Sequence, residues 1–145
     1  MRGPNGNVVK WNELRSIDFT VYRRMEFNSD RKRMSILVKD HDDGYYKLYV
    51  KGADSIIKER LDQRQLDSDL MDIVDTFLTR ASVKGYRTLL MGMKVLDESE
   101  IKAFLEDCEK AEQNLLTKDA QLQKIYDQFE RGFVLVGATC VEDRL

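Results

Sequence analysis

One aromatic side chain, Phe27, comes just before a basic run made of Arg31, Lys32 and Arg33, and a lysine–glycine pair, Lys51-Gly52, follows further along the chain. An aromatic ring can stack on a flat heterocycle, and lysine and arginine side chains bind anionic oxygens. An adenine ring that carries a chain of phosphates presents both features. These residue types therefore point to a site for an adenine nucleotide, provided that folding brings the two segments together.

A hairpin should bring them together. Residues 34–39 and 45–51 read as strands, because apolar and polar side chains alternate along them. The Asp43-Gly44 dipeptide between them is a strong signal for a two-residue turn, since both residues tolerate a positive φ. With that turn Ile36 faces Lys51, which places Lys51 at the open end of the hairpin beside the basic run. A register shift of one or two residues keeps the same open end.

The remaining elements alternate between strands and helices, which predicts an α+β domain with a mostly antiparallel sheet flanked by helices. Capping signals mark several helix starts, for example Asp97 with Glu100. The other expected elements are a strand at 19–27, a short helix that starts at Asp54 and ends near Leu61, a helix at 66–81 that ends before Gly85, a strand at 86–96, helices at 97–111 and 122–129, and a strand at 133–136.

Composition narrows the function classes. The chain has 145 residues, 34% of them charged, with a net charge of −2, which argues against a general nucleic-acid binder. No apolar run approaches the roughly 18 residues needed to span a bilayer, and no signal peptide is evident, so we expect a soluble piece, which could belong to a membrane protein. Cys108 and Cys140 are expected to be reduced thiols, and the lone His41 has no partner at metal-ligand spacing.

Four segments, in order, resemble the nucleotide-binding domain of P-type ATPases, in the form found in the phospholipid-transporting branch, the lipid flippases. The segments are Glu26-Phe27-Asn28-Ser29-Asp30-Arg31-Lys32-Arg33-Met34-Ser35, Lys51-Gly52-Ala53-Asp54, Tyr86-Arg87-Thr88-Leu89, and Gly137-Ala138-Thr139-Cys140-Val141-Glu142-Asp143-Arg144-Leu145. The resemblance covers residues 19–145. It implies a loose segment or expression remnant at 1–18, a domain core at 19–136, and a hinge at 137–145 that leads back toward the phosphorylation domain.

The resemblance also implies roles in ATP binding. Phe27 would stack on adenine, Lys51 would lie in the floor of the adenine pocket, and Gly52 would let the ligand approach the backbone. Lys32 and Arg87 would face the phosphates, with Arg31 or Arg33 in support. Because neighbouring side chains of a strand point to opposite faces, we expect only one member of the basic run, Lys32, to contact the ligand. The less specific members of the site are Ser29, Met34, Leu89 and Thr139.

The sequence also departs from the family. It contains no Asp-Lys-Thr-Gly-Thr, so the aspartate that these pumps phosphorylate is absent, as is the acidic segment that normally precedes the signature. The resemblance therefore implies a cytosolic domain of an integral membrane protein that presents ATP to an aspartate in another domain of the same chain. Mg²⁺, the phospholipid substrate and a possible accessory subunit belong to the full-length enzyme. The piece alone should bind ATP and not hydrolyse it, and no nucleic-acid partner is implied.

Simpler interpretations stand beside these roles. Phe27 could be a core residue at a strand end, Lys51 an ordinary surface lysine, and Arg87 one half of a salt bridge. The basic run could be a solvated patch that docks acidic partners or anionic lipid headgroups. Such docking would weaken with moderate salt and would not depend on Phe27. A P-loop nucleotide site is disfavoured, because the sequence has no Gly-x-x-x-x-Gly-Lys-[Ser/Thr].

Overall fold

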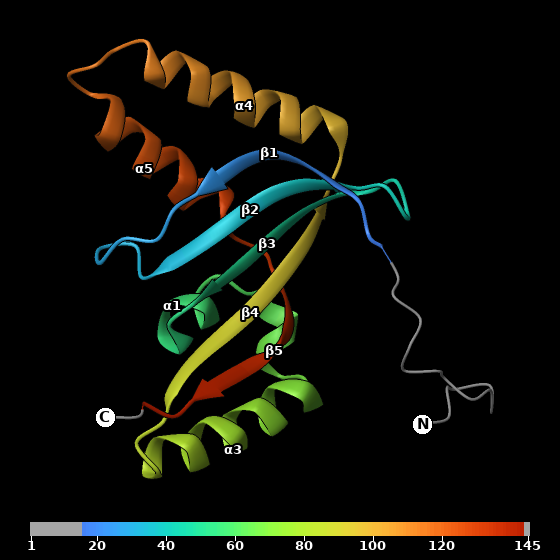
Figure 1. Ribbon diagram of the computed structural model, residues 1–145, viewed down its shortest axis with the longest axis vertical. Helices are drawn as coiled ribbons and strands as arrows, with labels where there is room; N and C mark the ends of the chain where they lie inside the picture. Colours follow the sequence, from blue (N-terminus) through green and yellow to red (C-terminus); the bar gives the residue numbers. More distant parts are fainter. Residues whose placement is uncertain (1–15, 144–145) are drawn as a thin grey trace.

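The computed structural model describes residues 16–143, which form a five-stranded antiparallel sheet with helices packed against it (Figure 1). The strands lie in chain order, so each one pairs with its sequence neighbour. This arrangement confirms the predicted α+β class. The strands are β1 (Phe19–Met25), β2 (Arg33–Asp40), β3 (Tyr46–Gly52), β4 (Arg87–Leu96) and β5 (Val134–Val141).

The helices share one face of the sheet. Helices α4 and α5 lie at one end of this layer, and α1 and α3 lie at the other (Figure 1). The core forms between them from alternate strand residues such as Leu37, Leu48 and Leu90, together with Ile57 and Phe104 of the helices. The helices are α1 (Asp54–Lys58), α2 (Gln63–Leu66), α3 (Asp69–Val83), α4 (Glu98–Glu112) and α5 (Lys118–Phe129).

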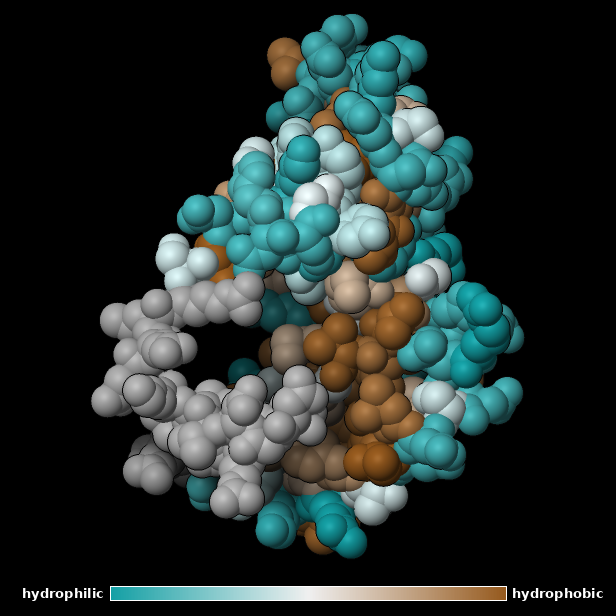
Figure 2. Space-filling view, turned by 90° about the vertical axis from the view of Figure 1, so that its right-hand side faces the viewer, coloured by the Kyte–Doolittle hydropathy of each residue, from teal (hydrophilic) through white to brown (hydrophobic). Residues whose placement is uncertain are grey.

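The opposite face of the sheet carries the other set of alternate residues, and no described helix covers it. Val95, Val134 and Val136 are about half exposed there. Figure 2 views the molecule from the right-hand side of Figure 1 and shows a broad apolar area below the polar helices at the top. We call this surface the open face. An exposed apolar area of this kind is typical of a binding surface.

The hairpin between β2 and β3 has a longer turn than expected. The Asp40 N–H donates to the carbonyl of Tyr45 at 2.9 Å, so four residues rather than two form the loop. As a result Lys51 pairs with Met34, and Ile36 pairs with Tyr49. The predicted partner of Lys51 was therefore wrong by two residues. A shift of two keeps every side chain on its original face, and the open end of the hairpin is the predicted one.

Several helix and strand ends differ from expectation. Helix α1 ends at Lys58 rather than near Leu61, and the predicted 66–81 helix is two helices, because Ser68 interrupts it. The Ser68 hydroxyl accepts a hydrogen bond from the Met71 N–H at 3.2 Å, which caps α3. Strand β5 continues to Val141, past the expected end at 136, and pairs with β4 except at Val136, where the register shifts. The run from 137 to 141 is thus part of the sheet.

Residues 1–15 of the loose segment predicted at 1–18 lie outside the described residues. Within residues 16–143, none of the helices is both long and apolar enough to cross a bilayer. The two cysteines are free thiols, with Cys108 buried in α4 and Cys140 exposed on β5.

Candidate functional site

The open face is hollowed into a groove of about 450 Å³ that crosses the sheet. Pockets of this size, mainly apolar with a few polar groups, are typical of small-molecule sites. All five strands contribute to it. Its lining residues are Arg24, Met25, Glu26, Met34, Ser35, Ile36, Tyr49, Val50, Lys51, Met91, Gly92 and Val136.

A row of three directly paired residues lies across the groove. Lys51 pairs with Met34 of β2 on one side and with Met91 of β4 on the other. Side chains of directly paired residues lie on the same face of a sheet, so the lysine stands between two methionine side chains. Lys51 is exposed, and none of the hydrogen bonds and ion pairs found among residues 16–143 involves its ammonium group. One cation in an apolar groove could bind one polar group of a flat, apolar ligand.

Three other predicted site residues share the open face with this row. Arg87 and Leu89 precede Met91 by four and two positions on β4, and side chains alternate along a strand. Thr139 pairs with Leu89. The Arg87 guanidinium lies at the end of this line, away from the groove lining, and donates to the carboxylate of Asp143 at 2.9 Å. Both side chains of that pair are largely exposed, at 74% and 59%.

The loop of residues 26–32, between β1 and β2, carries the remaining predicted contacts. Phe27 is 58% exposed, and Ser29 and Lys32 are also exposed. The Asn28 side chain accepts hydrogen bonds from the N–H groups of Asp30 and Arg31, at 3.0 and 2.7 Å, which closes the turn. The exposed ring of Phe27 is available to a ligand rather than buried in the core. Of this loop, the groove lining includes Glu26 alone.

Gly52 lies where the loop of residues 26–32 packs against β3. It pairs with Arg33 and is buried, and a Cβ at this position would lie 2.5 Å from the carbonyl oxygen of Lys32 and 2.7 Å from the Cβ of Arg33. The following N–H, of Ala53, donates to the same Lys32 oxygen at 3.0 Å. The glycine therefore admits the loop of residues 26–32. The expectation that it also lets the ligand approach the backbone stays a prediction.

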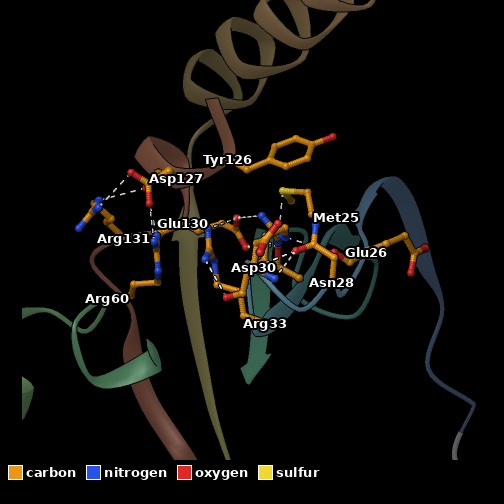
Figure 3. Close-up of polar contacts among 12 residues, drawn as sticks. Met25, Glu26, Asn28, Asp30, Arg33, Arg60, Tyr126, Asp127, Glu130 and Arg131 are labelled. Carbon is orange, nitrogen blue, oxygen red and sulfur yellow. Dashed lines mark hydrogen bonds and ion pairs between the residues drawn. The ribbon is translucent and has the colours of Figure 1, made fainter. Parts of the chain in front are cut away.

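Two members of the basic run are buried and already bound. The Arg31 guanidinium donates to both carboxylate oxygens of Glu130, at 2.6 and 2.9 Å, and Arg33 donates to the same carboxylate at 3.3 Å. The Ser35 hydroxyl adds a further hydrogen bond at 2.8 Å. Glu130 has no exposed surface. Figure 3 shows Arg33 and Glu130 directed toward one another at the end of α5. Lys32 is thus the one exposed cation of the run.

The carboxylate belongs to a larger group of charges that we call the arginine cluster, made of Arg31, Arg33, Arg60 and Glu130. Arg60 donates to the main-chain carbonyl of Glu130 at 3.0 Å and also binds the carboxylate of Asp127. Burial lowers the pKa of Arg33, and the negative charge of Glu130 opposes that effect. The ordinary pKa of arginine is so high that the guanidinium stays charged. The Nε atoms of Arg33 and Arg60 are buried without a hydrogen-bond partner.

Sequence reasoning missed Glu130 and Arg60 as parts of this region. Glu130 follows a helical stretch and precedes Arg131-Gly132, where an acidic residue looks like an ordinary surface residue at a helix end. The partners of its carboxylate are 95 to 99 residues away in sequence. Strand alternation predicted that only one member of the basic run faces the ligand, although it could not identify the anionic partner of Arg31 and Arg33.

Comparison with known proteins identifies the family of this chain. The family model described as P-type ATPase, cytoplasmic domain N, matches residues 6–145. The chain is 35% identical over 133 residues to phospholipid-transporting ATPase DNF2 of Saccharomyces cerevisiae and 37% identical over 121 residues to phospholipid-transporting ATPase tat-1 of Caenorhabditis elegans. It is 36% identical over 128 residues to human phospholipid-transporting ATPase IC.

These alignments cover 83–88% of this chain but only 8–11% of the relatives, so the chain spans about a tenth of their length. The part that matches includes the groove, the loop of residues 26–32 and the whole sheet. The family model and the relatives therefore match the whole of the domain that the structure describes. The chain belongs to the P-type ATPase family, as its cytoplasmic domain N, and its relatives are phospholipid-transporting ATPases.

Proposed function

We propose that this chain is the ATP-binding domain of a phospholipid-translocating P-type ATPase. The observation that carries the proposal is the open-face groove with Lys51 between Met34 and Met91, next to a loop that exposes Phe27 and Lys32. The apolar groove could bury an adenine ring. The cations at Lys32 in the loop and at Arg87 could bind the phosphates. Family membership supports the same assignment.

In this proposal each residue has one task. The methionines and Phe27 contact the adenine ring, and the Lys51 ammonium binds its polar edge. Lys32 and Arg87 bind phosphate oxygens, with Ser29 and Thr139 as neighbouring hydroxyls. For Arg87 this requires exchanging Asp143 for a phosphate group. The domain performs no bond-breaking step itself. It holds the γ-phosphate in position for an aspartate in another domain of the parent chain, and catalysis by such positioning is typical of phosphoryl transfer.

Mg²⁺ accompanies ATP in this chemistry, and the described residues do not fit a protein-bound ion. Residues 16–143 contain no group of three or more histidine, cysteine or acidic side chains arranged to hold a metal. The ion would therefore arrive on the phosphates of the nucleotide, with any protein ligands supplied by the phosphorylation domain. In the parent protein, phosphorylation and dephosphorylation would drive the movement of a phospholipid between leaflets, and this domain would lie on the cytosolic side.

The basic-patch interaction module is less well supported. Its premise was a cluster of three solvent-facing cations, and two of them, Arg31 and Arg33, are 4% and 5% exposed and bound to Glu130. A single lysine cannot provide the same attraction for an acidic partner or a lipid headgroup.

Titration with ATP, followed by amide chemical shifts in NMR spectra, tests the proposal. We expect shifts to concentrate at Phe27, Lys32, Lys51, Met91 and Arg87, with a dissociation constant on the order of 1 mM, equivalent to about −4 kcal/mol. Tripolyphosphate is the control, because it carries the charge without the ring. If ATP shifts no amide around the groove in this chain or in a longer piece of the parent protein, the proposal is wrong.

A further inference from the structure

We propose that Glu130 is a positioning residue for the nucleotide, because it holds the loop of residues 26–32 in the conformation that presents Phe27 and Lys32. This inference rests on the proposed function, since it assigns a residue to the same site. Glu130 lies on the helix-covered side of the sheet, opposite to the open face, and none of its atoms lines the groove. Its one direct contact with the groove lining is the hydroxyl of Ser35, which donates to it at 2.8 Å, so an effect on binding acts through the loop or through Ser35.

The first connection is the side chain of Arg31. Two of its nitrogens donate to Glu130, at 2.6 and 2.9 Å, while its third, Nε, donates to the main-chain carbonyl of Glu26 at 3.1 Å. One planar guanidinium thus joins the end of α5 to the residue just before Phe27. Bidentate binding fixes the plane of the guanidinium, which in turn fixes the direction of Nε toward Glu26.

The second connection is the side chain of Arg33. It binds Glu130 at 3.3 Å and donates to the main-chain carbonyl of Arg31 at 3.1 Å. The carboxylate of Glu130 therefore holds the side chains on both sides of Lys32 and, through them, two carbonyls of the loop. It is the one acidic group that binds both arginines among the residues the structure describes.

Lys32 itself has a backbone conformation that needs support. Its φ is +52°, a left-handed value that residues with a side chain seldom adopt. The Lys32 N–H donates to the carbonyl of Asn28 at 2.9 Å, and its own carbonyl accepts from Ala53 at 3.0 Å. With both neighbours anchored inward, the side chain of Lys32 is directed outward. Loss of the anchor at Glu130 would let this turn relax, and Lys32 and Phe27 would lose their fixed relation to the groove.

The competing explanation is that the arginine cluster only stabilises the fold. A buried ion pair is by itself weak evidence for stability, because removing charges from water offsets much of their attraction. The cluster also leaves Arg33 Nε and Arg60 Nε without partners. The contacts of the cluster with the carbonyls of Glu26 and Arg31 therefore favour a role in fixing the loop over a role in stabilising the fold. The two explanations predict different responses of binding and of melting temperature.

The test measures the dissociation constant for ATP and the thermal stability of Glu130→Asp, Arg31→Lys and the double variant. Both single changes keep the charge and break the geometry, Glu130→Asp by shortening the side chain and Arg31→Lys by losing the bidentate contact and the Glu26 bond. Glu112→Asp is the control for shortening another glutamate that pairs with an arginine, although at a more exposed site (39% against 0%). Glu112 pairs with Arg23 at 2.5 Å, at the same helical layer, and makes no hydrogen bond to the loop.

We expect each single change to weaken ATP binding at least fivefold, with altered amide shifts at residues 26–32, and the double variant to be little worse than either, because both remove the same link. Glu112→Asp should bind as the wild-type chain does. The inference is overturned if Glu130→Asp and Arg31→Lys melt earlier yet bind ATP with unchanged affinity, or if the control weakens binding equally. If the unmodified chain does not bind ATP, the proposed function has failed instead.

Discussion

At the scale of single residues, Phe27 and Lys51 differ in how the fold supports them. Lys51 has its place set by the ladder of a central strand, since it pairs on both sides. Phe27 lies in a loop and exposes 58% of its surface. Its removal should therefore cost little stability, and any loss of binding reports on contact with the ligand.

Substitution Phe27→Ala is expected to weaken ATP binding about 2- to 10-fold, because a ring stack contributes about 0.5–1.5 kcal/mol. Binding of tripolyphosphate should not change, since it has no ring. Phe27→Tyr is the control that keeps the ring. Isothermal titration calorimetry or NMR titration measures the affinities of the wild-type chain and both variants for the two ligands. Equal losses for ATP and tripolyphosphate would show that Phe27 does not contact adenine.

Asp143 is expected to compete with the nucleotide for Arg87, given that its carboxylate accepts from this guanidinium at 2.9 Å. Substitution Asp143→Asn should strengthen ATP binding, by no more than about fivefold, because an exposed ion pair contributes at most about 1 kcal/mol. Glu142→Gln removes the same charge one residue earlier and serves as the control. An unchanged affinity in Asp143→Asn, measured at low salt, would argue against a role for Arg87 at the phosphates.

At the scale of elements, the β2–β3 hairpin is held at both ends. At its closed end, the Lys47 ammonium binds the carboxylates of Asp40 and Asp43, at 2.9 and 2.5 Å. At its open end, Gly52 admits the loop of residues 26–32. A separate prediction follows from the contacts at each end.

The open end predicts that Gly52→Ala is destabilising, because the new methyl would lie 2.5 Å from the Lys32 carbonyl oxygen. Overpacking of this kind costs about 1–3 kcal/mol, and each kcal/mol lowers the melting temperature by roughly 3 °C. Gly137→Ala is the control, since a Cβ there meets nothing within 4 Å. Similar melting temperatures for both variants, measured by circular dichroism, would mean that the loop can move away at little cost.

The closed end predicts a dependence of stability on pH. Hydrogen bonds from Lys47 lower the pKa of Asp40 and of Asp43 below the ordinary value of 3.8. Because the folded pKa values are depressed, this stabilisation is present above about pH 4 and disappears as the pH falls through them. Asp43→Asn should therefore be less stable than the wild-type chain at pH 7, and the difference should vanish near pH 2. Urea unfolding at both pH values measures it, and a constant difference would contradict the assignment.

The sequence predicts those elements that depend on local pattern, and it fails where distant residues decide. Alternation placed the strands, and the capping pair of Asp97 with Glu100 placed the start of α4, where both hydrogen bonds form at 2.8 and 2.9 Å. The split at Ser68 was not predicted, because its helical spacing continues across the break. The turn after Asp40 was not predicted either, since Asp-Gly fits loops of two and of four residues.

The candidate site likewise contains some features that the sequence predicts and others that depend on distant residues. The faces of Met34, Lys51 and Leu89 follow from strand alternation, which could be read from the sequence, and the structure places them together on the open face. The bound state of Arg31 and Arg33 could not be read, because their partner Glu130 is almost a hundred residues away. The packing of Gly52 against the loop of residues 26–32 could not be read either, because it depends on how the loop folds back onto β3.

At the scale of the whole molecule, the two thiols report on different events. Cys140 is exposed, whereas Cys108 has no exposed surface in the core, and burial raises its pKa to about 11. Only a thiolate reacts readily, so Cys108 can be labelled only when the core opens. Cys140 should react with a disulfide reagent at once, and Cys108 should react only as fast as opening of the core allows.

ATP is expected to slow the labelling of Cys108 and leave that of Cys140 unaffected. A ligand that binds only the folded chain stabilises it by RT ln(1 + [L]/Kd), so ATP at ten times its dissociation constant should slow labelling about 11-fold. Tripolyphosphate at the same concentration is the control for charge alone. Equal rates with and without ATP, under conditions where opening is in fast equilibrium, would show that ATP does not bind the folded chain.

The alternation of the basic run has a consequence for how substitutions in it should be judged. A general substitution table scores lysine and arginine as close equivalents at any position. Here Lys32 is directed outward, so an arginine keeps its charge in solvent, while Arg31 fits between Glu130 and the Glu26 carbonyl, where a lysine cannot bind both. Exchange between these two amino acids is thus mild at position 32 and severe at position 31. A family variant that differs at only one of them should be assessed by which face that position occupies, and not by its net charge.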